Sequence, residues 1–448
     1  MKKVIVIFSI IILALLFDAC TALFLTGQKS YIKVNGIHFE LNGKPYYYAG
    51  ANFWTAAYLG APDQIGDRKR LIRELDKLHS LGITNIRVLG ASEQSIKGGV
   101  VKPGFITKPG VYNEDLLKGT DFLLSEMNKR DMHAVIFLTN TWEWSGGMGQ
   151  YKAWADDSNS ANSAVPDMNY PEYMNYAASF YRTEEAKEIY YKYLYNLITR
   201  KNEYTGLYYC EDPAIMSWEI ANEPRPGNGE EGQKWLDEYY RWINSTALFI
   251  HRLDHNHLVT TGSEGIVGSL DSAQVYVEAN KSKYIDYLTF HLWPKDWSWF
   301  DINKADSTYP QTEVKSEDYI NEHIELAREL RKPIVLEEFG LQRDSSIVPG
   351  TPTDFRDRYY YKIFSQVYNS ASTGSPVAGA AFWLWGGEGA SKIGTYNWGF
   401  GRNNGMVDDD NSVYDLDAST LKIIKEYADN FNSLRNKNIL LKQSVLSD

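Results

Sequence analysis

The sequence predicts a (β/α)8 barrel, or TIM barrel, an α/β fold in which eight parallel strands close into a cylinder inside a ring of helices. Eight short apolar runs recur along the chain, and amphipathic stretches of helical periodicity stand between them. No charge block, low-complexity tract or Pro/Ser-rich linker divides residues 30–435, which favours one domain. Parallel strands need long crossovers, and right-handed crossovers close such a sheet.

Residues 1–20 have the pattern of a secretory signal peptide. Two lysines precede an apolar run from Val4 to Phe17, and Cys20 follows a small residue. The run is shorter than the roughly 20 residues that span a bilayer. A signal that ends in a small residue and Cys resembles the bacterial lipobox, whose Cys becomes the lipidated first residue of the mature protein. We therefore expect an exported chain, either lipid-anchored at the bacterial cell envelope through Cys20 or secreted after plain cleavage, with a single barrel domain over 21–448.

A short N-terminal β-hairpin is expected ahead of the barrel. Asn35-Gly36 and Asn42-Gly43 stand between alternating apolar residues, and Asn-Gly pairs of this kind favour tight hairpin turns. We expect this hairpin to cover the bottom of the barrel.

The barrel elements then follow in order. The eight expected strands are 46–52, 84–89, 133–139, 215–221, 258–261, 287–291, 334–338 and 378–385. The expected helices are 68–80, 115–130, 184–201, 233–253, 317–330 and 354–370, with 418–432 after the eighth strand and the least regular helical pattern at 270–280. In this fold the chemistry is carried out at the C-terminal ends of the strands.

Charge and aromatic content limit the class of ligand. The net charge of −11 argues against a nucleic-acid partner, because phosphate backbones bind basic surfaces. The chain has 13 Trp and 32 Tyr, and flat rings with polar tips suit ligands that have apolar faces and polar rims. Sugars are such ligands.

Carboxylates follow two well-separated strands. The segment IMSWEIANEPRP places Glu223 at the end of the fourth strand, and KPIVLEEFG places Glu337 and Glu338 at the end of the seventh. Successive strand residues face opposite sides, so only one of the last two is expected to point into the barrel mouth. Two carboxylates that converge on one cavity can cleave a glycosidic bond. The residues alone leave a structural ion-pair network or a metal site as alternatives.

Seven segments together resemble glycoside hydrolase family 5, and within it the β-mannanases. They span residues 49–389 and read, in order, AGANFWTAAYLG, NIRVLGASE, LTNTWEWSGGMGQY, SWEIANEP, TFHLWPKDW, VLEEFG and AFWLWGGEG. This family has a (β/α)8 barrel with its acid/base on strand four and its nucleophile on strand seven.

The resemblance implies a role for each polar residue at the mouth. Glu223 would be the acid/base and Glu338 the nucleophile, which leaves Glu337 facing the barrel wall. Asn222 would hydrogen-bond the sugar 2-hydroxyl. Arg87 would hold the nucleophile ionised through charge-assisted bonds.

The resemblance also identifies substrate-binding rings. His291 would lie near the acid/base, and Trp293 stands where many family members have Tyr. Trp383 resembles the platform under the sugar that is cleaved, and Trp54 and Trp142 are further candidates for stacking on sugars. They belong to a set of tryptophans just past strand ends: Trp54, Trp142, Trp144, Trp293, Trp297, Trp299, Trp383 and Trp385.

The expected function is a retaining, endo-acting hydrolase of β-1,4-mannosidic bonds in mannan-type polysaccharides, working as a monomer without metal or organic cofactor. Retention requires the two carboxyl groups to lie roughly 5 to 5.5 Å apart. A β-1,4-glucanase or mixed-specificity β-glycanase is the alternative within the enzyme class. A non-catalytic, surface glycan-binding lipoprotein is the alternative outside it. The His-rich segment HRLDHNH is expected at the bottom of the barrel and not at a metal site.

Overall fold

The computed structural model describes residues 29–158, 160, 162–344, 350–389 and 411–435. The expected signal peptide and Cys20 lie outside these residues. Within the described ranges, no helix combines the length and the apolar character that crossing a membrane requires.

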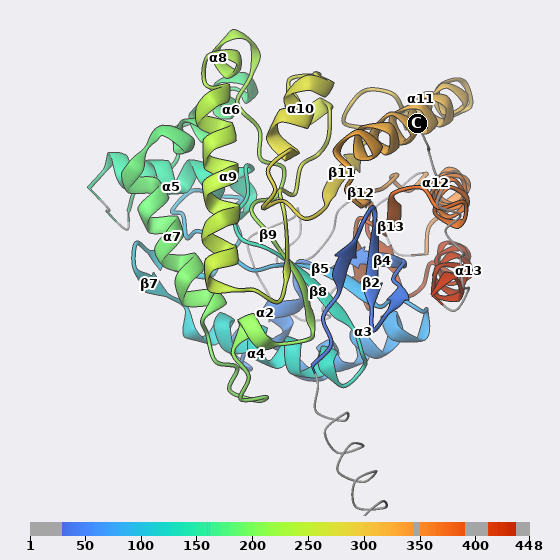
Figure 1. The fold of residues 1–448 in the computed structure, drawn as a ribbon, viewed down its shortest axis with the longest axis horizontal. Helices are drawn as coiled ribbons and strands as arrows, with labels where there is room; N and C mark the ends of the chain where they lie inside the picture. The colour runs from blue at the N-terminus through green and yellow to red at the C-terminus, as the bar shows by residue number, and fades with distance from the viewer. Residues whose placement is uncertain (1–28, 159, 161, 345–349, 390–410, 436–448) are drawn as a thin grey trace, which may run out of the picture.

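Eight parallel strands form the central sheet, as predicted (Figure 1). Neighbouring strands follow the order β10-β9-β8-β5-β4-β13-β12-β11, and a main-chain hydrogen bond from Asp286 to Val259 joins the two ends of this series. Every residue of these eight strands is buried except His133, which fits strands covered on both faces. The bounds are β4 (Tyr48–Asn52), β5 (Asn85–Leu89), β8 (His133–Phe137), β9 (Ile215–Glu219), β10 (Leu258–Thr260), β11 (Leu288–Leu292), β12 (Ile334–Phe339) and β13 (Val377–Phe382).

Helices surround these strands (Figure 1). Each predicted helix is present, including the one expected at 270–280. They are α3 (Arg68–Ser80), α4 (Glu114–Asn128), α7 (Glu184–Ile198), α9 (Leu236–Leu253), α10 (Ala273–Asn280), α11 (Ala305–Leu330), α12 (Asp354–Ser372) and α13 (Ala418–Leu434). The helix α11 begins well before the expected position because Pro310 lies inside it without ending it.

A small antiparallel sheet precedes the barrel. Its strands are β1 (Lys33–Asn35), β2 (His38–Leu41) and β3 (Lys44–Pro45). Asn42 and Gly43 both have positive φ, as a type I′ turn requires. Phe39 packs edge-on against Tyr287, just before β11, at 5.2 Å between ring centroids. The sheet therefore covers the N-terminal end of the barrel, as expected.

The loops beyond the strands contain further short elements. The helical ones are α2 (Ala56–Gly60), α5 (Gly147–Asp156), α6 (Tyr170–Ala178), α8 (Gly229–Lys234), η1 (Glu143–Ser145), η2 (Ser179–Arg182), η3 (Tyr209–Glu211), η4 (Val267–Ser269) and η5 (Ile302–Lys304). Two strand pairs, β6 (Ile106–Lys108) with β7 (Val111–Tyr112) and β14 (Trp385–Gly387) with β15 (Val413–Tyr414), complete the set. The eighth barrel strand thus ends at Phe382, and Trp385 belongs to a separate strand.

Two glycines let α2 and α4 touch backbone to backbone. A Cβ on Gly119 would lie 2.1 Å from the carbonyl oxygen of Ala57, and a Cβ on Gly60 would lie 2.4 Å from that of Gly119. Neither neighbour is the end of a flexible side chain, so the helices would have to separate to admit a methyl group.

We expect Gly119→Ala to lower the free energy of unfolding by about 1–3 kcal/mol, the usual cost of overpacking. Urea unfolding followed by circular dichroism measures this. Gly98→Ala is the matched control, because no atom lies within 4 Å of its Cβ position. Equal stability of the two variants would contradict the close packing of α2 on α4.

Candidate active site

A β-bulge in β12 brings two neighbouring carboxylates to the inside of the barrel. Phe290 pairs with Leu336, but His291 pairs with Glu338, so Glu337 is the extra residue of β12. The pairing with β13 skips one residue over the same stretch. The expectation that Glu337 faces the barrel wall is therefore wrong, since strict alternation fails at a bulge. Its carboxylate lies 3.6 Å from Arg87 and 3.8 Å from His291.

Glu223 and Glu338 meet at the barrel mouth although they lie on different strands. One carboxylate oxygen of each, together with a ring nitrogen of His291, lies within 4.8 Å of the others. Inverting glycosidases separate their carboxyl groups by roughly 6.5–9.5 Å to admit a water, whereas retaining ones need roughly 5–5.5 Å. The geometry fits a double displacement with retention.

The backbone of Glu223 is held in an uncommon conformation. Its φ is 48°, in the left-handed region that non-glycine residues rarely adopt. Main-chain bonds to both neighbouring segments secure it: Glu223 N–H donates to Gly262 at 2.8 Å, and Thr141 N–H donates to the carbonyl of Asn222 at 3.0 Å. The strands on either side of β9 thus fix the direction of this carboxylate.

Arg87 connects most of the polar groups below the mouth. Its guanidinium is 2% exposed and donates two bonds to Glu219, at 2.7 and 2.5 Å. It also donates to Glu338, to Asn52 at 3.1 Å and to Asn222 at 2.7 Å. The predicted neighbour of the nucleophile is therefore in place. Burial raises the pKa of Glu338, and the charges of His291 and Arg87 offset part of that effect.

Asn222 is fixed by a second amide that the sequence reasoning missed. Its Nδ2 donates to Asn140 Oδ1 at 3.0 Å, and the same oxygen accepts the main-chain N–H of Trp142 at 3.0 Å. Asn140 therefore links the loop after β8 to the residue before the acid/base candidate. Its position at the C-terminal end of a strand was the available signal.

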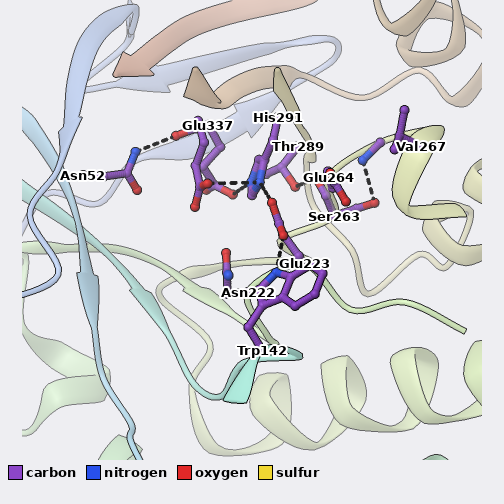
Figure 2. Close-up of polar contacts among 12 residues, drawn as sticks. Asn52, Trp142, Asn222, Glu223, Ser263, Glu264, Val267, Thr289, His291 and Glu337 are labelled. Atoms are coloured by element: carbon purple, nitrogen blue, oxygen red, sulfur yellow. Dashed lines mark hydrogen bonds and ion pairs between the residues drawn. The ribbon is translucent and has the colours of Figure 1, made fainter. Parts of the chain in front are cut away.

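His291 lies between carboxylates (Figure 2). Its Nδ1 is 2.7 Å from Glu223 and 3.4 Å from Glu338. Burial alone would lower the pKa of His291, but the charge of Glu338 and the bond to Glu223 raise it to about 10. For Glu223 the effect of burial has the opposite sign and raises the pKa. The hydrogen bond and the charge of His291 outweigh burial and bring the pKa of Glu223 to about 2. Glu223 and His291 therefore hold one proton between them over a wide pH range.

A cavity of about 580 Å³ opens above these residues, within the usual range for ligand sites. Five of the tryptophans predicted near strand ends line it: Trp142, Trp144, Trp293, Trp297 and Trp383. The other three do not. Trp385 is buried and donates to Glu74, and Trp299 packs on Trp297.

The expected role of Trp54 in sugar binding is not supported. Its side chain is 1% exposed and is absent from the cavity lining. It packs against Trp144 and Tyr58, with ring centroids 5.6 and 6.0 Å apart. Trp54 does follow a strand end, as predicted. Its ring is buried by residues distant in the sequence, and the local sequence pattern does not reveal such contacts.

Trp142 contacts the acid/base candidate directly (Figure 2). Its Nε1 donates to Glu223, and its ring stacks on Tyr170 with centroids 5.5 Å apart. The Arg225 guanidinium lies 5.3 Å from the same ring. On another wall, Trp293 and Trp383 meet edge to face at 6.0 Å. Rings on several walls can stack on the faces of a sugar chain.

Sequence reasoning missed an ion pair in the cavity wall. Arg225 pairs with Glu264, which follows β10, and Trp297 Nε1 donates to the same carboxylate at 3.2 Å. Burial and the charge of Glu223 raise the pKa of Glu264 to about 7. Its position just past a strand end could have identified it.

One grouping could hold a metal ion within the described part of the chain, and it is Glu223, His291 and Glu338. The Arg87 guanidinium already neutralises Glu338 there. The histidines of HRLDHNH do not gather: His257 contacts Asp254 at 2.6 Å, and His251 contacts Asp286 at 3.1 Å.

A buried carboxylate secures the loop that carries Trp142. Glu93 is fully buried and accepts the main-chain N–H of Gly147 at 2.6 Å and the hydroxyl of Thr139 at 3.3 Å. Its own N–H donates to Ser145 at 2.8 Å. Burial raises the pKa of Glu93 to about 7.

The raised pKa of Glu93 predicts that the free energy of unfolding depends on pH. The folded state binds this proton more tightly than the unfolded chain, so stability falls as the pH rises from about 4.5 to about 7. We expect Glu93→Gln to remove that fall, which amounts to about 3 kcal/mol between pH 4.5 and pH 8. Urea unfolding across this range measures it, with Glu143→Gln on the same loop as control. Parallel curves for the wild type and Glu93→Gln would contradict it.

Comparisons with known proteins agree with this geometry. Residues 29–436 match the model of a family described as GH family 5 beta-mannosidase-like. A putative mannan endo-1,4-beta-mannosidase of Arabidopsis thaliana is 30% identical over 89% of this chain and 90% of its own length. A mannan endo-1,4-beta-mannosidase of Solanum lycopersicum is 28% identical over 82% of this chain and 86% of its own.

Solved structures have the same fold. A glycoside hydrolase family 5 mannosidase from Rhizomucor miehei superposes with a TM-score of 0.81 at 34% identity, covering 91% of this chain and 99% of that one. An endo-1,4-beta-mannanase from the same organism has a TM-score of 0.65 at 22% identity, over 91% and 100%.

Proposed function

This chain belongs to glycoside hydrolase family 5, and we propose that it cleaves β-1,4-mannosidic bonds in mannan-type polysaccharides with retention of anomeric configuration. One observation carries the proposal: Glu223 and Glu338 bring carboxylate oxygens within 4.8 Å of each other beneath a cavity lined by tryptophans. That separation suits a covalent intermediate.

In the first step a carboxylate oxygen of Glu338 attacks the anomeric carbon of the bound mannosyl unit. The bond from this carbon to the departing oxygen breaks, and Glu223 gives that oxygen the proton that it shares with His291. Arg87 positions the attacking carboxylate, and the product is an ester between the sugar and Glu338.

In the second step Glu223 accepts a proton from a water that attacks the same carbon. The ester bond breaks, Glu338 leaves as the carboxylate, and the proton returns to the Glu223–His291 pair. Two inversions give net retention. In this proposal Asn222 bonds the sugar 2-hydroxyl, and its hydrogen bonds with Arg87 and Asn140 support that role.

The names of the relatives support the choice of mannan and of internal cleavage, since several are mannan endo-1,4-beta-mannosidases. Release of mannose from chain ends is a second candidate mode, because the structure that matches at 34% identity with a TM-score of 0.81 is titled a mannosidase and not an endo-mannanase. A structure of that mannosidase is titled as a complex with mannosyl-fructose.

We propose further that the chain is exported as a monomer and is either anchored through a lipid on Cys20 or secreted. The support is the apolar run and the small residue before Cys20. Membrane fractionation of cells that express Cys20→Ala against the wild type tests the anchor.

Glutamine at either carboxylate is expected to stop turnover of mannan. Glu223→Gln should lower kcat on mannan about 10²–10⁴-fold, the usual range for a general acid. It should form the mannosyl-enzyme normally from an aryl mannoside whose phenol needs no protonation. Glu338→Gln should react with neither mannan nor the aryl mannoside, because no carboxylate is left to attack the anomeric carbon. The surface variant Glu388→Gln, which only weakens a pair with Arg73, serves as control.

A product time course on unbranched mannan distinguishes the two modes. Internal cleavage gives oligomers of many sizes and an early fall in viscosity, whereas chain-end cleavage releases one small product from the start. The anomeric proton signal of the first product reports retention. Faster hydrolysis of a soluble cellulose derivative would favour a glucanase instead, and binding without hydrolysis of any glycan would favour a binding protein.

A further inference from the structure

Two buried polar groups behind the acid/base face each other without other hydrogen-bond partners. The Nε2 of His291 and both carboxylate oxygens of Glu337 have no hydrogen bond among the described residues. His291 Nε2 lies 3.8 Å from one carboxylate oxygen of Glu337, and Glu337 is 2% exposed. Figure 2 shows the two side chains beside each other. Buried polar groups of this kind are rarely left unpaired without a functional or structural reason.

Glu337 cannot reach the substrate. It is absent from the lining of the large cavity and instead borders a void of about 10 Å³ deeper in the barrel, with Arg87, Asn85 and Tyr48. That volume is close to the space of one water molecule. Any effect of Glu337 on the reaction must therefore pass through a neighbouring side chain.

Arg87 has no N–H left for Glu337. A guanidinium has five N–H donors. In Arg87, Nε and Nη2 bond Glu219, Nη1 bonds Asn52 and Glu338, and Nη2 also bonds Asn222. His291 Nε2 is therefore the remaining donor that faces Glu337 among the described residues.

We propose that Glu337 is a positioning residue for the acid/base, whose negative charge holds His291 as an imidazolium and so keeps a proton on the Glu223–His291 pair. This inference rests on the proposed function, in which that proton goes to the leaving oxygen. A neutral His291 could offer a proton to only one of the two carboxylates. The doubly protonated ring serves both, with Nδ1–H toward Glu223 and Nε2–H toward Glu337.

The other charges around His291 leave this role to Glu337. Glu223 and Glu338 face Nδ1 from the ends of β9 and β12. Glu264, after β10, accepts the main-chain N–H of His291 and directs its carboxylate to Arg225. Glu219 lies in β9 and forms an ion pair with Arg87 of β5. Glu337 is thus the carboxylate at the Nε2 side of the ring.

The pH profile of kcat/KM tests the proposal. Removing the negative charge should lower the pKa of His291, so Glu337→Gln should move the basic limb to lower pH by about one unit. Glu337→Asp retains the charge and should leave the limb within a few tenths of a unit of the wild type. Glu388→Gln also removes a carboxylate, but its side chain pairs with Arg73 at the surface and lies away from His291, so the basic limb of this control should not move. An unmoved limb in folded, active Glu337→Gln would overturn the proposal.

Nuclear magnetic resonance of ¹⁵N-histidine-labelled protein gives a readout without substrate. In the wild type both ring nitrogens of His291 should carry protons at pH 8, and Glu337→Gln should lose one of them at a pH about one unit lower than the wild type does. The signal is assigned by its loss in His291→Asn. A singly protonated His291 at neutral pH in the wild type would overturn the proposal even where no variant folds. If the ring behaves as expected but no β-mannoside is hydrolysed, the proposed function fails and the Glu337–His291 interaction stands.

Discussion

The buried guanidinium of Arg87 is the interaction on which the rest of the site depends. Its donors reach Asn52 at the end of β4, Glu219 in β9 and Glu338 in β12, so one side chain ties strands across the width of the barrel. Removing one partner of a buried ion pair typically costs about 3–5 kcal/mol, because the other charge is left uncompensated. The residue that orients Glu338 is therefore also one that holds the strands of the barrel together.

The buried acidic groups around Arg87 outnumber the basic groups. The site therefore binds protons that more exposed carboxylates would release. Arg87 and His291 face four carboxyl groups: Glu219, Glu223, Glu337 and Glu338. Burial raises the pKa of Glu219 to about 8, and the charge of Arg87, which donates to both of its oxygens, offsets part of that effect. A glycosidase needs both a carboxylate to attack and a proton to donate, and a cluster with more acids than bases supplies both.

The sequence predicted the barrel because strand and helix periodicities are local properties. Positions at strand ends singled out Glu223 and the pair Glu337–Glu338, and the resemblance to family 5 chose Glu338 from that pair. Glu337 was placed wrongly because a bulge depends on pairing with β11 and β13, which one strand does not reveal. Trp54 and Trp142 have the same residue type and the same position after a strand. Only tertiary packing separates the buried ring from the one that contacts Glu223.

The strained backbone at Glu223 is held by segments next to the barrel strands, whereas Trp142 is positioned by its loop. A φ of 48° at a glutamate costs about 1–3 kcal/mol and persists only where the surroundings over-determine it. Hydrogen bonds from the segments after β8 and β10 do so, and they aim the carboxylate at both His291 and Trp142. The loop that brings Trp142 is in turn held by Glu93 and Asn140. The direction of the Glu223 carboxylate is thus set by hydrogen bonds to the segments beside β9, and the position of the Trp142 ring in the cavity wall is set by loop residues outside the cavity lining.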